Sequence, residues 1–117
     1  MKLERYQEAI PELKEAIRLG EWEPNVYSNL GFANKKLGDA KSAISILEEG
    51  VSKNLLGYGL CHGEIYQRLG RYYDENGQYE KALVQFQKAV KHKDDDNEVD
   101  KKYVQDMINK LNSRLGK

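Results

Sequence analysis

The side chains with the greatest chemical reactivity in this chain are one cysteine and two histidines. Cys61 and His62 are adjacent, and His92 follows much later in the sequence. A structural zinc site needs four ligands at a characteristic spacing, and a cysteine nucleophile needs a base within reach and a third group that orients the base. Neighbouring side chains on a helix do not face each other. The sequence therefore predicts no metal site, no cofactor and no catalytic residue, and we expect the protein not to be an enzyme.

An acidic run near the C-terminus is the second candidate for chemistry. Asp94, Asp96, Glu98 and Asp100 alternate as the ligands of a calcium loop do, but the run lacks the central glycine and the terminal bidentate glutamate of such a loop. Asn97, with Asp100 three residues later, fits a helix N-cap instead, since acidic and amide side chains accept bonds from free backbone N–H groups. We expect this segment to begin a helix.

Composition excludes several classes of function. The 117 residues contain 19 basic and 19 acidic side chains, so the chain lacks the excess of positive charge that a general nucleic-acid binder needs. No stretch of about 18 apolar residues is present, and residues 1–10 are too charged for a secretory signal, so we expect no membrane insertion. The single cysteine forms no internal disulfide, which favours a cytoplasmic protein.

The most informative pattern is a repeat. Tyr27-x-x-Leu30-Gly31 recurs as Tyr66-x-x-Leu69-Gly70, 39 residues later. Each copy is followed, at the same spacing, by a triplet of an alanine, a large apolar residue and a small residue. A triplet of the same kind also occurs 34 residues before the first of these two. The three triplets are Ala9, Leu13, Ala16, then Ala43, Leu47, Gly50, then Ala82, Phe86, Ala89. A fixed period of this length indicates stacked structural repeats.

These residues resemble the tetratricopeptide repeat (TPR), a helix–turn–helix unit of 34 residues. The resemblance covers roughly residues 1–96, although the motif's terminal proline is absent and Leu55 and Asp94 stand in its place. It implies an all-α fold, a TPR-like right-handed superhelical solenoid of antiparallel helix pairs. Together with the apolar periodicity it predicts about six helices. They are expected at roughly 3–19, 24–37, 40–53, 62–76, 79–92 and 97–115.

The organisation that follows is a single domain over residues 1–117. It is expected to contain a half repeat over 1–23, a repeat over 24–62, a repeat over 63–96 and a C-terminal capping helix over 97–117. The second of these segments holds a five-residue insertion near Gly57-Tyr58-Gly59, which either lengthens a helix or forms a longer loop. Small residues in the motif are expected where helices approach closely, and Gly38 and Gly77 where a helix ends and the chain turns.

The resemblance also predicts where a partner binds. Repeat proteins of this kind hold another protein or peptide on a concave surface lined by the first helix of each repeat. The candidate residues on that surface are Asn25, Ser28, Asn29, Phe32, Lys36, Glu64, Gln67, Arg68, Arg71 and Glu75. In chaperone-binding members, an Asn and an Arg at the places of Asn29 and Arg68 help to clamp a carboxylate. Glu64 stands where those members carry a Lys, which disfavours the clamp here.

The N-terminal helix raises a second possibility. Its apolar stripe normally packs on the first helix of a repeat, so part of the stripe is expected to face water. Three explanations remain open: the chain is part of a longer array, it self-associates as a homo-oligomer, or its helices repack. The candidate self-association residues are Leu3, Tyr6, Ile10 and Leu13. The sequence thus predicts a non-catalytic scaffold for protein–protein interaction, with self-assembly through the N-terminal helix as the alternative.

Overall fold

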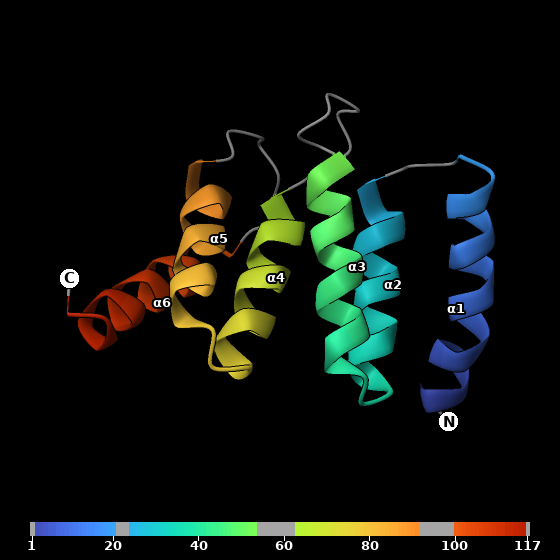
Figure 1. Ribbon diagram of the computed structural model, residues 1–117, viewed down its shortest axis with the longest axis horizontal. Helices are drawn as coiled ribbons and strands as arrows, with labels where there is room; N and C mark the ends of the chain where they lie inside the picture. The colour runs from blue at the N-terminus through green and yellow to red at the C-terminus, as the bar shows by residue number, and fades with distance from the viewer. Residues whose placement is uncertain (1, 21–23, 54–62, 92–99, 117) are drawn as a thin grey trace. The chain divides into compact units, whose positions relative to one another are not determined.

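The computed structural model describes residues 2–20, 24–53, 63–91 and 100–116. All regular secondary structure in these ranges is helical, which confirms the predicted all-α fold (Figure 1). The helices are α1 (Lys2–Arg18), α2 (Pro24–Lys36), α3 (Ala40–Lys53), α4 (Gly63–Glu75), α5 (Tyr79–Lys91) and α6 (Lys101–Arg114). The insertion expected near residues 57–59 lies outside the described residues.

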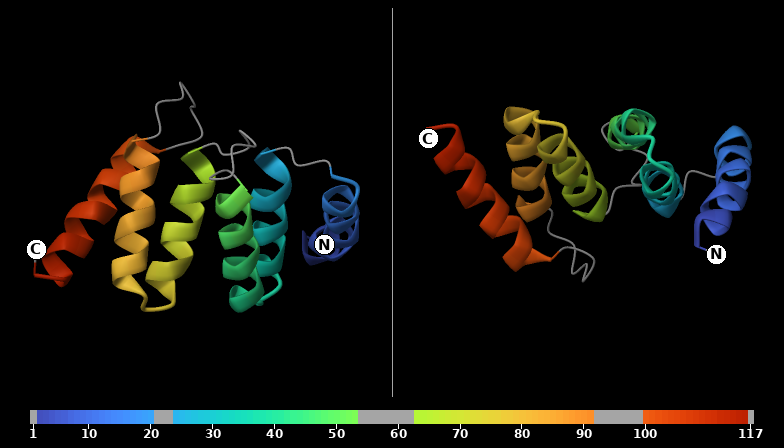
Figure 2. Two further views of the ribbon diagram at one scale, coloured as in Figure 1. Left: turned by 45° about the horizontal axis from the view of Figure 1, so that its top comes forward. Right: turned by 90° about the horizontal axis from the view of Figure 1, so that it is seen from below.

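The chain divides into two compact units, Met1–Cys61 and His62–Lys117. In the first unit α2 and α3 form an antiparallel pair, and α1 packs against α2. In the second unit α4 and α5 form the equivalent pair, and α6 packs against α5 (Figure 2). Each unit is thus one helical hairpin with one further helix beside it.

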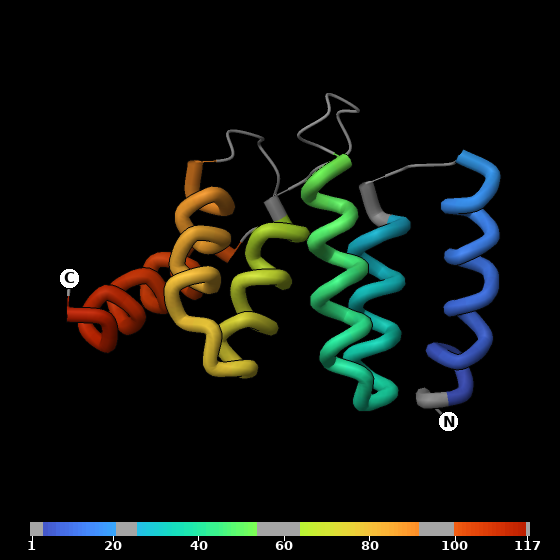
Figure 3. The backbone as a smooth tube through the Cα atoms, in the orientation of Figure 1, coloured from blue at the N-terminus to red at the C-terminus, as the bar shows by residue number. Residues whose placement is uncertain are grey.

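The two hairpin turns are alike and are built on glycine, as predicted. Gly38 and Gly77 adopt φ angles of 88° and 77°, a left-handed conformation that costs glycine little. After each glycine the next backbone N–H donates to a carbonyl five residues earlier, from Asp39 to Asn34 and from Gln78 to Tyr73, at 2.9 Å in both cases. This bonding satisfies carbonyls at the end of the first helix and reverses the chain within a few residues (Figure 3).

The small residues of the repeat allow close packing within each pair. A methyl group at Gly31 would lie 2.7 Å from Cδ2 of Leu47, and one at Gly70 would lie 3.1 Å from the ring of Phe86. Both Leu47 and Phe86 are completely buried, at 0% exposure. The prediction that glycine marks the close approach of the paired helices is confirmed at both positions.

The start of the last helix differs from the prediction. The expected helix over 97–115 begins at Lys101, and its N-cap is Asp100, whose carboxylate accepts a bond of 3.0 Å from the backbone N–H of Tyr103. Asn97, the expected cap, lies outside the described residues. The backbone N–H of Asp100 donates to Oε1 of Gln67 on α4 at 2.9 Å, so a contact between helices fixes where α6 starts.

Candidate partner-binding site

The first unit contains a helix whose apolar face is only partly covered. Tyr6, Ile10, Leu13 and Ile17 recur at intervals of four, three and four residues, which places them on one face of α1. All four are half-buried. Among the described helices, α2 alone packs extensively against α1. Helix α2 therefore covers the apolar face of α1 in part, and the rest of that face stays accessible.

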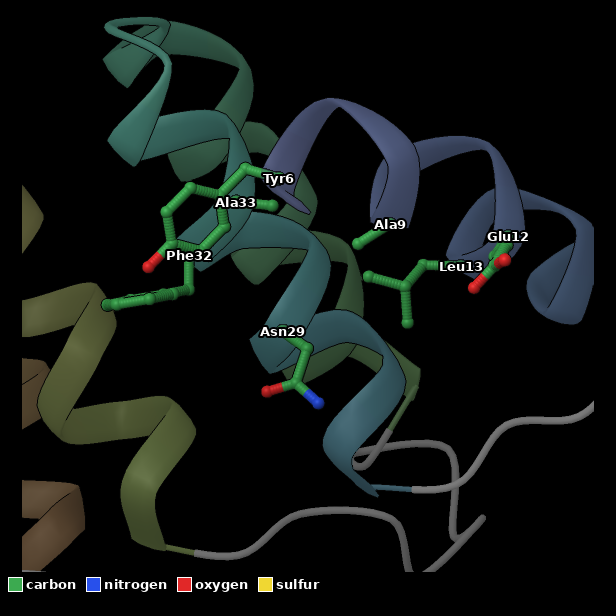
Figure 4. A pocket seen from close by; sticks show the side chains of 7 residues that line it. All are labelled: Tyr6, Ala9, Glu12, Leu13, Asn29, Phe32 and Ala33. Atoms are coloured by element: carbon green, nitrogen blue, oxygen red, sulfur yellow. The ribbon is translucent and has the colours of Figure 1, made fainter. Parts of the chain in front are cut away.

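A pocket of about 360 Å³ lies between α1 and α2. Figure 4 shows side chains from both helices around it. The lining residues are Tyr6, Ala9, Glu12 and Leu13 of α1 and Asn29, Phe32 and Ala33 of α2. Five of these seven side chains are apolar or aromatic, and a pocket of this size and lining suits an apolar group of a binding partner.

Two aromatic rings build one wall of the pocket. The rings of Tyr6 and Phe32 meet edge to face, with centroids 5.7 Å apart and an interplanar angle of 73°. This arrangement is favourable for aromatic pairs and links α1 to α2. The ammonium group of Lys36 lies 5.2 Å from the centroid of Phe32, within the range of a cation–π interaction. The wall is thus held in place from both helices.

The lining side chains with polar atoms are Tyr6, Glu12 and Asn29. The Glu12 side chain on α1 and the Asn29 side chain on α2 are both exposed. An asparagine amide both donates and accepts hydrogen bonds, whereas an ionised glutamate only accepts them. The pocket therefore combines an apolar surface with one hydroxyl group, one amide and one negative charge.

The α2 residues of the predicted surface differ in their exposure. Asn29 and Phe32 line the pocket, and Lys36 is exposed. Ser28 is an error in the prediction, because it is buried with only 3% of its surface exposed. Since α2 packs against α1 and against α3, it keeps only a narrow exposed strip, and Ser28 falls outside it. The side chain of Asn25 is outside the described residues.

The α4 residues of the predicted surface lie in the second unit and are largely paired. Arg68 contacts Glu64 at 3.2 Å, and Arg71 contacts Glu75 at 3.5 Å. Gln67 was predicted as a binding residue, but it accepts the bond from Asp100 and so holds the start of α6. The Glu64 carboxylate beside Arg68 offsets the charge that a carboxylate clamp would need.

The residues predicted for self-association are partly at the pocket. Tyr6 and Leu13 line it, Ile10 is half-buried on the same face of α1, and the side chain of Leu3 is outside the described residues. The structure therefore brings together residues that the sequence assigned to two different surfaces. Ala9, Glu12 and Ala33 were not predicted as site residues. Ala9 had a usable signal as a repeat position near Leu13, and Ala33 had one as an apolar residue three positions after Leu30, but Glu12 had none.

The structure does not describe the other candidates for chemistry. Cys61, His62 and His92, like the acidic positions 94, 96 and 98, lie outside the described residues. Within the ranges that the structure covers, no group of three His, Cys, Asp or Glu side chains is placed to hold a metal ion. No helix in those ranges has the length and apolar character needed to cross a membrane.

Comparison with known proteins identifies the class of protein. Two models of the tetratricopeptide repeat match the chain, over residues 24–52 and 63–96, and together they span more than half of its 117 residues. The chain belongs to the tetratricopeptide-repeat family. A search of the curated proteins found no match.

A solved structure shares the fold. It is the first TPR of Spaghetti (RPAP3) bound to the HSP90 peptide SRMEEVD, and the match covers 99% of this chain and 84% of that one. The TM-score is 0.74 and the sequence identity is 19%. At this identity the likeness establishes the fold alone, an all-α tetratricopeptide-type arrangement.

Proposed function

We propose that this protein is a non-catalytic interaction scaffold that binds a segment of another protein at the pocket between α1 and α2. The observation that carries the proposal is the apolar pocket of about 360 Å³, with Tyr6, Leu13 and Phe32 in its lining. Half-buried aromatic side chains are costly to leave in water and are common anchors of protein interfaces. The single cysteine suits a reducing compartment such as the cytoplasm.

The family supports this proposal in a general way. The similar structure from Spaghetti holds a peptide, so the fold is compatible with this activity. Fold alone does not define the partner, because one scaffold supports many interactions through different side chains. In this chain the feature that favours partner binding is the pocket between α1 and α2.

The test is a selection of binding peptides from a random library, followed by affinity measurements on variants of the full chain. Peptides that use the pocket should lose roughly tenfold or more in affinity with Phe32→Ala, the loss typical of a buried aromatic anchor. Val84→Ala is the matched control, because Val84 is an exposed apolar residue on α5, with 45% exposure. Selected peptides that bind both variants like the unmodified chain would refute the proposal.

A second candidate function is self-assembly through α1. It is favoured by one observation, the half-buried state of Tyr6, Ile10 and Leu13 on a single helix face. Molar mass measured by light scattering over a wide range of concentration distinguishes the two. A mass that rises with concentration, and returns to the monomer value with Ile10→Glu, supports self-assembly. A constant monomer mass excludes it.

A further inference from the structure

We propose that the partner presents an α-helix with an aromatic-x-x-Leu-Gly pattern, which docks on Ala9, Leu13 and Ala16 of α1. This inference rests on the proposed function and specifies its partner. It comes from a comparison that the molecule itself provides: the same three repeat positions occur in α1, α3 and α5, and in two of these helices the structure shows what covers them.

In α3 and α5 the three positions are covered by the preceding helix. Ala43 and Leu47 of α3 are 0% exposed, and Gly50 is buried as well. Leu47 packs where Gly31 of α2 has no side chain, since a methyl group at Gly31 would meet Leu47 at 2.7 Å.

The second unit repeats this arrangement. Ala82, Phe86 and Ala89 of α5 have exposures of 0%, 0% and 1%, and Phe86 packs against Gly70 of α4. Both covering helices carry Tyr-x-x-Leu-Gly.

In α1 the equivalent positions are only partly covered. Ala9, Leu13 and Ala16 are all half-buried, and Ala9 and Leu13 line the pocket. Leu13 occupies the repeat position of Leu47 and Phe86, which each pack against a glycine of the preceding helix. We therefore expect Leu13 to pack against a glycine of the docking helix. A side chain on the flank of that helix would enter the pocket beside Phe32.

A second folded copy of this chain does not offer the required helix. The pattern occurs twice in the 117 residues, and both copies are already used. Tyr27 and Leu30 have exposures of 2% and 3%, and Tyr66 and Leu69 have exposures of 6% and 1%. The docking helix therefore comes from outside a folded copy of these 117 residues.

Charge adds a further requirement. Glu12 stands at the repeat position that Ile46 holds in α3 and Gln85 holds in α5, so α1 alone has a carboxylate there. An arginine or lysine on the partner helix would form an ion pair with it at the pocket. The α4 helix carries Arg68 and Arg71 beside its Leu-Gly pair, where α2 carries Asn29 and Phe32, so the test peptide is taken from α4.

The experiment uses a synthetic peptide with the sequence of residues 63–76, acetylated and amidated at its ends, and the full chain. Binding is followed by fluorescence anisotropy of the labelled peptide. We expect saturable binding that weakens roughly tenfold or more with Leu13→Glu, the scale of losing a central apolar anchor. Ala9→Leu replaces a small apolar side chain by a larger one that fills the pocket, and it should weaken binding as well. Because it introduces no charge, this second variant guards against a folding defect in Leu13→Glu.

Two controls are matched to this design. Val84→Glu introduces the same charge on α5 and should leave the affinity unchanged. A peptide with leucine in place of the glycine that corresponds to Gly70 keeps the apolar character but blocks the close approach of helices, and should bind roughly tenfold more weakly or worse.

The outcomes separate this inference from the proposed function. Absence of saturable binding, or equal binding by the Leu13→Glu and unmodified chains, overturns the helical partner. If library-selected peptides still depend on Phe32 in that case, the proposed function stands and the occupant is a segment without this helical pattern. If the molar mass rises with concentration and Leu13→Glu abolishes this rise, the occupant of the α1 face is a second copy of the chain. That result also overturns the inference.

Discussion

The first and last helices carry similar apolar stripes, yet they are packed to very different degrees. In α6, Val104 and Leu111 are 0% exposed and Ile108 is 8% exposed. In α1, the corresponding stripe of Tyr6, Ile10 and Leu13 is half-buried throughout. An apolar stripe therefore shows that a helix packs on one face, but it does not show how completely that face is covered.

Specific side-chain contacts account for the burial of the apolar stripe of α6. Tyr103 meets Phe86 edge to face with centroids 6.0 Å apart, and the guanidinium of Arg114 lies 4.4 Å from the centroid of Tyr79. Burial raises the pKa of Tyr103 above its usual value of 10.0, which agrees with a tyrosine packed into an interface. These contacts join both ends of α6 to α5.

The largest predicted difference between the two ends is in stability. Leu111→Ala should lower the free energy of unfolding by about 3 kcal/mol, since it removes a fully buried side chain and leaves a cavity. Leu13→Ala should cost about 1 kcal/mol, because Leu13 already faces water in part. Urea denaturation followed by circular dichroism measures both, and equal losses would show that α1 is as firmly packed as α6.

The two helical hairpins provide the next comparison. Gly31→Ala should destabilise by about 1 kcal/mol, because the clash with Leu47 at 2.7 Å exceeds the gain in helix propensity. Gly70→Ala should change stability by less than about 0.5 kcal/mol, since the ring of Phe86 at 3.1 Å needs to move only slightly. The same denaturation experiment applies, and a reversed order would mean that the second pair is the tighter one.

A smaller effect on stability is expected at the turn before α3, and this effect depends on pH. The Asp39 carboxylate accepts a bond of 3.0 Å from the backbone N–H of Ser42, and this bond holds its pKa below the usual value of 3.8. The ionised form therefore stabilises the folded state above pH 3.8, and this contribution is lost as the pH falls through the lowered pKa.

Asp39→Asn tests this directly, since asparagine is also a good N-cap but carries no charge. The unmodified chain should have the higher denaturation midpoint at pH 7, and the difference should shrink toward zero at acidic pH below the folded-state pKa. A difference that stays constant with pH would contradict the assignment.

The smallest effects concern two arginines at the ends of the terminal helices. Arg114→Ala should cost about 0.5 kcal/mol through the lost contact with Tyr79. Arg18→Ala removes a bond of 2.8 Å from its Nε to Oε2 of Glu15, but this pair is exposed and its loss should have no measurable effect. A larger loss with Arg18→Ala than with Arg114→Ala, seen in thermal denaturation, would reverse the comparison of the two ends.

Local rules were enough to predict most of the fold. The helix boundaries followed from apolar periodicity and from Gly38 and Gly77, because turns of this type depend on the residues nearest to them. The start of α6 was misplaced because Asn97 and Asp100 are equally good capping residues, and the choice between them depends on the contact with Gln67. Ser28 was assigned to the binding surface by helical periodicity, but it is buried because α2 packs against both α1 and α3.

The pocket was predicted only in pieces. Periodicity placed Tyr6 and Leu13 on one face of α1 and Asn29 and Phe32 on one face of α2, but it gives no distance between two helices. The two sets were therefore assigned to different functions. Glu12 follows no apolar pattern, and Ala33 lies on the apolar face of α2 with Val26 and Leu30. Both line the pocket because α1 and α2 lie side by side.

The most direct test of the account is chemical-shift mapping of the isotope-labelled chain during titration with the peptide of residues 63–76. The account predicts that the largest changes occur at backbone amides of residues 6–16 and 29–33, while those of α5 and α6 stay unchanged. Changes concentrated on α5 and α6, or spread evenly over the chain, would contradict the assignment of α1 and α2 as the partner-binding site.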